Sequence, residues 1–117
     1  MAKKYQNKVH LDWEGNPLRI HKEQGKDELI DVRTEEIFTI ILNNAQMRTM
    51  NDSIQGNRLA VSMKKCKDGE FIEIEDGVYD WLKEQAQTIC PPAFRINAGG
   101  IMEFILEGFE KSHQPKE

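Results

Sequence analysis

The sequence predicts an α+β fold, in which an N-terminal β-hairpin and a short third strand pack on three or four helices. Residues 8–22 alternate polar and apolar side chains on both sides of a turn-forming cluster, a pattern typical of two paired strands. Further along the chain, apolar residues recur at helical spacing in several separate segments. The chain has 117 residues, of which 38% are apolar, and this size and composition suit one domain with one core.

The hairpin is predicted over residues 8–22, with its turn centred on Gly15 and Asn16. That turn would place Trp13 opposite Leu18. One face of the hairpin would then consist of Leu11, Trp13, Leu18 and Ile20. Because a lone hairpin is marginal in water, this face needs a cover of helices.

The single domain is predicted to span residues 8–109, between a flexible N-terminus at residues 1–7 and a flexible polar tail at residues 110–117. The chain has no run of 18 apolar residues, and no apolar segment of a signal peptide follows its basic start. We therefore expect neither a membrane span nor a membrane partner.

The first helix is predicted to begin at Thr34, a good N-cap that is followed by two acidic residues in the first turn. It continues to Ala45 with a wide apolar arc, so we expect it to be the most buried helix. The β-branched residues within 37–42 leave a buried strand as the alternative. Residues 43–56 are polar and are predicted to be a loop.

The second half of the chain predicts more helix. Residues 58–67 are the next expected helix, and residues 71–74 are the expected third strand. The spacing leaves open whether this strand pairs with the hairpin. A helix follows over residues 76–89 and should end before the proline pair at 91–92, and Asn97 would cap a last helix.

Charge is distributed unevenly along the chain. Residues 1–67 carry a net charge of +3 and residues 68–117 one of −7, which together give the total of −4. Such a separation can steer a charged partner, but a pair of solvated faces is the preferred explanation.

The candidate catalytic and metal-binding groups are few. His10 and His21, as expected cross-strand neighbours, could hold a metal with Asp12, but zinc sites need three or four ligands in a dry environment. Cys66 lies among lysines that would favour a reactive thiolate, yet helical spacing places it on the apolar side, and Cys90 is also expected to be a buried thiol. We therefore predict no catalytic residue, no metal and no cofactor, and a protein that is not an enzyme.

An acidic run follows residue 68, and Trp81 lies beside it. Aromatic residues anchor many protein interfaces. We therefore predict that a protein partner, or a second copy of the chain, binds at Trp81, Asp76, Asp80 and Glu73. Trp13 on the hairpin is the other large aromatic that could serve as an anchor, although tryptophans are more often core residues.

A basic cluster on the 58–67 helix gives an alternative function, a nucleic-acid-associated regulator. Its residues are Arg58, Lys64, Lys65 and Lys67. Nucleic acid is nevertheless not the expected partner, because the isoelectric point is about 5.4 and no binding motif is present.

Four segments carry a resemblance to known proteins: Val9–Ile20, Arg58–Cys66, Glu70–Leu82 and Cys90–Pro92. In this order they are similar to a group of small phage and prophage proteins of about a hundred residues. Those proteins share a D-x-x-G-x-P-L opening, an R-L-A helix and a proline-containing final segment. The chain departs from their pattern at residues 61–63 and 97–100.

The resemblance implies a viral or mobile-element origin and supplies no catalytic residue. We accordingly expect a protein–protein interaction module, a phage or prophage accessory, assembly or host-modulating protein, in the cytoplasm of a bacterial host.

Overall fold

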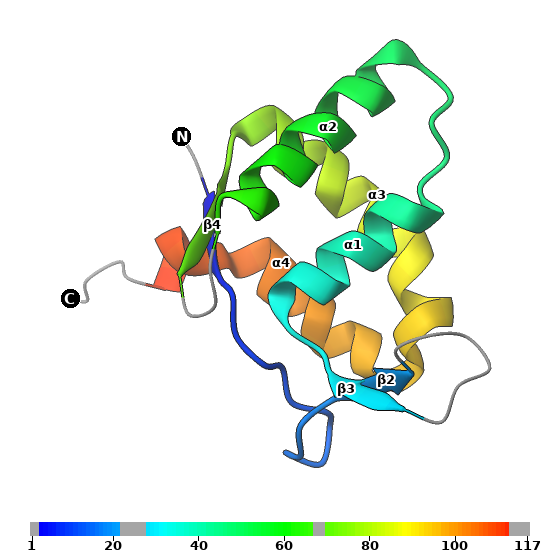
Figure 1. The fold of residues 1–117 in the computed structure, drawn as a ribbon, viewed down its shortest axis with the longest axis vertical. Helices are drawn as coiled ribbons and strands as arrows, with labels where there is room; N and C mark the ends of the chain where they lie inside the picture. Colours follow the sequence, from blue (N-terminus) through cyan, green and yellow to red (C-terminus); the bar gives the residue numbers. More distant parts are fainter. Residues whose placement is uncertain (1–2, 22–27, 67–69, 113–117) are drawn as a thin grey trace.

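The computed structural model describes residues 3–21, 28–66 and 70–112. The α+β fold is confirmed: two small antiparallel sheets, of two strands each, lie beside four α-helices and one 3-10 turn (Figure 1). No helix of the described residues is long and apolar enough to cross a membrane.

An N-terminal hairpin is present, but its strands differ from the predicted ones. β2 (Arg19–His21) pairs with β3 (Leu29–Asp31). The predicted first strand of the hairpin forms isolated bridges instead, from Val9 to Arg33 and from Leu11 to Pro17. The cause is a tight turn at Asp12, whose carboxylate accepts from the backbone N–H groups of Glu14 and Asn16. The predicted pairing of Trp13 with Leu18 is therefore wrong, and the side chain of Trp13 is 69% exposed.

The N-terminal residues, predicted to be flexible, belong to the fold. β1 (Lys3–Gln6) pairs antiparallel with β4 (Phe71–Ile74), so the expected third strand is confirmed and joins β1 instead of the hairpin. Tyr5 is fully buried on β1, and its hydroxyl donates to the carbonyl of Ile105 at 2.6 Å. The predicted tail at 110–117 starts too early, because helix continues to residue 112; residues 113–117 lie outside the described residues.

α1 (Thr34–Asn44) decides the alternative at residues 37–42 in favour of a helix. Thr34 is not its N-cap, since Arg33 occupies that position and the Thr34 hydroxyl instead donates to the carbonyl of Gln6. Asn7 supplies the missing cap: its side-chain oxygen accepts from the backbone N–H of Glu35. The segment after β1 thus holds the start of α1 in place.

α2 (Met50–Lys64) includes part of the predicted loop at 43–56 and extends the predicted 58–67 helix towards the N-terminus. A capping box starts it, in which the Thr49 hydroxyl accepts from the Asp52 N–H and the Asp52 carboxylate accepts from the Thr49 N–H. These two hydrogen bonds stabilise the first turn of α2, which has few apolar residues that could pack on the core.

α3 (Asp76–Phe94) continues through the proline pair that was expected to end it. The two carbonyls that lose a helical partner belong to Gln87 and Thr88, both exposed, so water can satisfy them. Arg95, at φ 55°, then turns the chain into the 3-10 turn η1 (Arg95–Asn97), which leads into α4 (Ala98–Ser112). The core lies between α1, α3, α4 and the inner face of the β1–β4 sheet.

Candidate interaction face between α2 and β4

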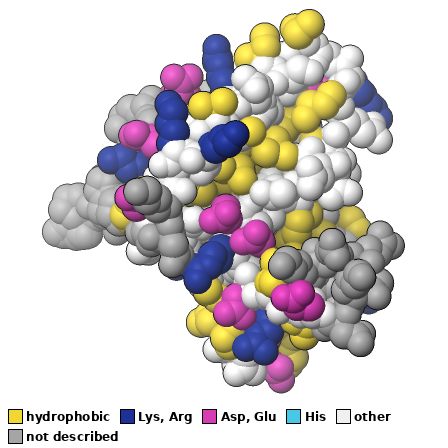
Figure 2. Space-filling model, in the orientation of Figure 1, with side chains coloured by type: hydrophobic (Ala, Val, Ile, Leu, Met, Phe, Trp, Pro, Cys, Tyr) yellow, Lys and Arg dark blue, Asp and Glu magenta, His cyan; other side chains and the backbone are white. Residues whose placement is uncertain are grey.

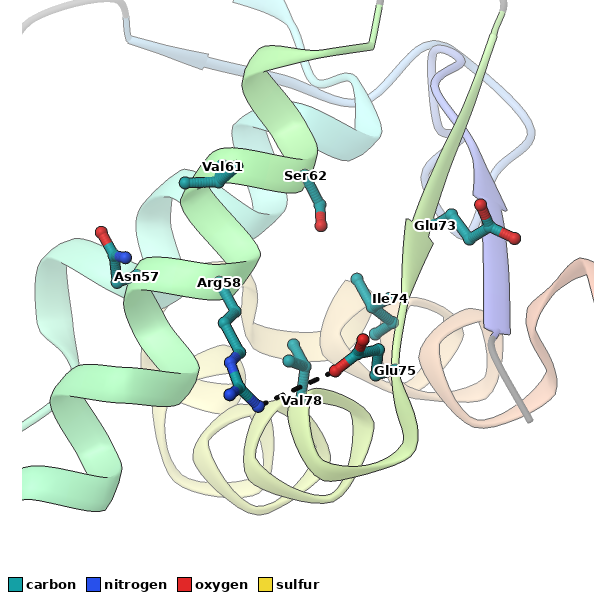
Figure 3. Close-up of a pocket in the computed structure, with 8 residues that line it drawn as sticks. All are labelled: Asn57, Arg58, Val61, Ser62, Glu73, Ile74, Glu75 and Val78. Atoms are coloured by element: carbon teal, nitrogen blue, oxygen red, sulfur yellow. Dashed lines mark ion pairs between the residues drawn. The ribbon is translucent and has the colours of Figure 1, made fainter.

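A groove of about 500 Å³ opens between α2 and the edge of β4 that faces away from β1. Figure 3 shows β4 standing between β1 on one side and α2 on the other. One wall consists of Asn57, Arg58, Val61 and Ser62 of α2, and the other of Glu73, Ile74 and Glu75. Val78 of α3 forms part of the floor.

The backbone of β4 presents hydrogen-bonding groups to this groove. Asn7 donates from its N–H to the carbonyl of Glu70, and the strand register therefore makes Tyr5–Ile72 the next hydrogen-bonded pair. Glu73 falls in the alternate class, opposite Lys4, so its N–H and C=O point away from β1. None of the described residues is hydrogen-bonded to these two groups.

The side chains along this edge are mainly acidic. Glu73 is exposed on the outer face of the sheet, opposite Lys4. Glu75 is also exposed and reaches across the groove to Arg58, with 3.7 Å between their oxygen and nitrogen (Figure 3). Exposed ion pairs of this kind contribute little stability, so Arg58 remains available to other ligands.

α2 carries an apolar stripe on its solvent side. Met50, Ile54 and Val61 are 75%, 41% and 45% exposed, and at about 100° per residue they fall within roughly 40° of the helix circumference. The buried Leu59 lies on the opposite side. In Figure 2, hydrophobic side chains gather at the upper end of the molecule, where the N-terminal part of α2 lies. The stripe ends at the groove, because Val61 lines both.

Trp81, the predicted aromatic anchor, does not lie on this face. Its side chain is 4% exposed, and its indole N–H donates to the Asp52 carboxylate at 3.0 Å. That bond, together with the N–H groups of Thr49 and Arg48, lowers the pKa of Asp52. Trp81 thus joins α3 to the capped start of α2, and its predicted role as an exposed contact is corrected to a structural one.

The three predicted acidic residues are exposed but lie apart. Glu73 belongs to the groove, whereas Asp76 and Asp80 lie in the first turns of α3. Asp80 borders a second, polar hollow near Trp81 and Lys83. Of the predicted partner-binding residues, Glu73 alone lines the groove.

The predicted basic face is divided. Arg58 lies in the groove, while Lys64 is nearly two turns further along α2 and about 120° around the helix from Arg58. Lys65 lies at the C-cap of α2, and Lys67 lies outside the described residues.

The candidate reactive groups are buried or half-buried. His10 does not face a metal: its Nε2 is bonded to the Thr34 hydroxyl at 2.9 Å, and burial, helped by Lys8, lowers the pKa of His10 to about 4. Because the Thr34 hydroxyl donates its hydrogen to Gln6, the imidazole must donate from Nε2. Within the described ranges, no three His, Cys, Asp or Glu side chains gather to hold a metal. Neither Cys66 nor Cys90 forms a disulfide; Cys66 is half-buried, and burial raises the pKa of Cys90 to about 11.

The apolar stripe was not predicted, because residues 43–56, which include Met50 and Ile54, were expected to form a loop. Their spacing from Val61, four and then seven residues, is helical and could have revealed the stripe. No family model matches this chain, and comparisons with curated proteins and with solved structures gave no match. Function is therefore inferred from the geometry of the face formed by α2 and β4.

Proposed function

We propose that the chain is a non-enzymatic protein-interaction module, which binds a protein partner on the face formed by α2 and β4. The observation that carries this proposal is the solvent-exposed apolar stripe of α2, which ends in a groove lined by an open strand edge. The proposed setting, as an accessory, assembly or host-modulating protein of a phage or prophage in the bacterial cytoplasm, depends on the sequence resemblance alone.

The stripe supports binding because exposed apolar side chains gain free energy when a partner covers them. Burying apolar surface contributes about 25 cal/mol per Å², and clustered apolar exposure beside a polar rim is typical of interaction sites. A helix needs only one apolar face to pack on its own core, and Leu59 and Gly56 provide that face in α2. The second face at Met50, Ile54 and Val61 therefore has no partner among the described residues.

The alternative, a nucleic-acid-associated regulator, receives less support. Arg58 already faces Glu75, and Lys64 lies on another side of the helix. The groove also carries the acidic Glu73 close to where a phosphate would approach. A duplex-binding surface requires clustered positive charge.

A display selection with the whole chain as bait tests the proposal. A library of random peptides is selected against the wild type, and the enriched pool is then measured on two variants, Val61→Glu and Ile96→Glu. Val61 lines the groove, whereas Ile96 is also aliphatic, is more exposed and lies in η1, at the lower end of Figure 1, away from α2.

We expect binders that the Ile96→Glu control retains and that Val61→Glu weakens about tenfold or more, because a buried unpaired charge is costly at an interface. Thermal unfolding of both variants must remain close to the wild type, which checks that the groove still forms. Absence of any enriched binder, or equal binding by both variants, would refute the proposed face.

A further inference from the structure

We infer that the open edge of β4 takes up an extended, basic segment of another protein as an added strand, with a lysine or arginine opposite Glu73. This inference rests on the proposed function and specifies its binding mode and partner. It comes from the groove, from the direction of the Glu73 backbone and from the charge along β4.

The open edge of β4 can bind a partner through the backbone of Glu73. The N–H and C=O of Glu73 point into the groove, and an extended peptide offers a C=O and an N–H at the matching spacing. Strand addition of this kind supplies affinity through main-chain hydrogen bonds and specificity through alternate side chains.

The position of α2 makes the site a groove instead of a bare edge. Ser62 stands across from β4, and Val78 closes the floor (Figure 3). The volume of about 500 Å³ lies within the range of well-formed ligand pockets. A strand placed there would have β4 on one side and the end of the apolar stripe on the other.

The side-chain pattern of the added strand follows from the pleat. A residue opposite Glu73 projects its side chain on the same outer face as Glu73, where a positive charge is favourable. The residues on either side project the other way, onto the face of the sheet where Ile72 and Ile74 lie. The occupant is therefore an alternation of small apolar and basic residues.

Charge also distinguishes this occupant from a second copy of the chain. An antiparallel pair of β4 strands centred on Glu73 would place the two Glu73 carboxylates opposite each other, and like charges in that position are destabilising. Glu75 is a second carboxylate at this end of the strand, and its ion pair with Arg58 is exposed. The charge of Glu73 thus disfavours pairing between two copies of β4 and favours pairing with a basic strand.

The test uses the intact chain and a synthetic seven-residue peptide of alternating valine and lysine, with capped ends. Amide NMR titration follows the backbone N–H of Glu73, and the reference is the same peptide with glutamate in place of lysine. We expect the Glu73 amide signal to shift, and the lysine peptide to bind about tenfold or more tightly than the glutamate peptide.

Modified peptides and protein variants distinguish the contribution of backbone hydrogen bonds from that of the charge of Glu73. Methylating the peptide nitrogens that face β4 should abolish binding, while methylating the alternate nitrogens should change it less than about twofold. Glu73→Lys should reverse the preference between the two peptides; Glu84→Lys, an equal change of charge at an exposed position of α3 outside this groove, should not.

The outcomes distinguish this inference from the proposed function. If the lysine peptide does not shift Glu73, if both methylation patterns act alike, or if the chain dimerises through β4, strand addition is refuted. The proposed function still stands in those cases when the display selection yields binders that Val61→Glu removes, for example helical peptides on the α2 stripe. If the selection also fails, both ideas are refuted.

Discussion

His10 should make the stability of this protein depend on pH between its usual pKa of 6.5 and about 4. The imidazole is buried against Phe104, with 4.5 Å between ring centroids, and donates to Thr34. Burial, helped by the charge of Lys8, lowers the pKa of His10 from 6.5 to about 4. The group is therefore neutral in the folded chain at pH values where it is already protonated in the unfolded chain.

The sign and size follow from this difference. The stability that neutral His10 contributes is complete above the unfolded pKa of 6.5 and is lost as the pH falls through the folded value near 4. At about 1.4 kcal/mol per pKa unit, the loss amounts to roughly 3 kcal/mol at most. Below the folded pKa both states are protonated, and the contribution becomes constant.

Urea denaturation of the wild type and of His10→Gln between about pH 7 and pH 4 measures this effect. Glutamine keeps a donor for Thr34 but does not titrate. Carboxylates lower the stability of both proteins on acidification, so the informative quantity is the difference between their free energies of unfolding. We expect the wild type to lose up to about 3 kcal/mol more than the variant. Parallel pH profiles would show that His10 is not held neutral by burial.

Three further predictions concern stability. Tyr5→Phe should lower the free energy of unfolding by about 1 kcal/mol at neutral pH, because it removes the hydrogen bond to Ile105. Burial also raises the pKa of Tyr5, so the phenol opposes folding once it would ionise in the unfolded chain. The variant should therefore be less sensitive to alkali above about pH 10 than the wild type, as alkaline unfolding curves would show. Gly56→Ala should raise the free energy of unfolding by up to about 1 kcal/mol, because the new methyl would make ordinary contacts of 3.5 Å with Leu42 and Trp81 and only the flexible end of Met47, at 3.1 Å, has to move; a lower melting temperature would contradict this. Thr49→Ala should cost about 1 kcal/mol by removing the N-cap of α2, and amide exchange should show that the loss is confined to the first turn.

The sequence predicted the elements whose packing is local. α1 was found because Ile37, Phe38 and Ile41 repeat at the period of a helix that packs on a single core. The strand at Phe71–Ile74 was found because its side chains alternate. In both segments the signal lies within a few neighbouring residues, and no distant partner is needed to interpret it.

The predictions were wrong where the local structure depends on a distant partner strand or on a single side chain. β1 contains one buried apolar residue, Tyr5, and its partner strand begins at Phe71, so nothing in the first seven residues indicates a strand. The hairpin register depends on the carboxylate of Asp12, which folds the chain into a turn where alternation predicts an extended strand. The start of α2 depends on Thr49 and Asp52, a spacing that the sequence does contain.

The two tryptophans show why the candidate site could be predicted only in part. Trp81 is buried because α2 approaches α3 closely at Gly56, where a Cβ would lie 3.5 Å from the Trp81 ring. The acidic residues around Trp81 in the sequence lie on the solvent side of α3, so their proximity along the chain gave a false indication of exposure. Trp13 is exposed instead, because the turn at Asp12 removes it from the predicted face.

Glu73 is the one predicted partner residue that the fold brings to the groove, and its charge can be explained in two ways. Charged residues on an edge strand often serve only to prevent aggregation. Protection alone, however, would be served equally by packing α2 directly over the edge, as helices do in many sheets. Here α2 packs beside β4, yet a groove of about 500 Å³, lined by Val61 and Ser62 on the α2 side, remains between them. An edge that repels its own copy but keeps its backbone accessible beside an apolar wall is suited to selecting a basic strand, and the reversal of peptide preference by Glu73→Lys is the result that separates selection from protection.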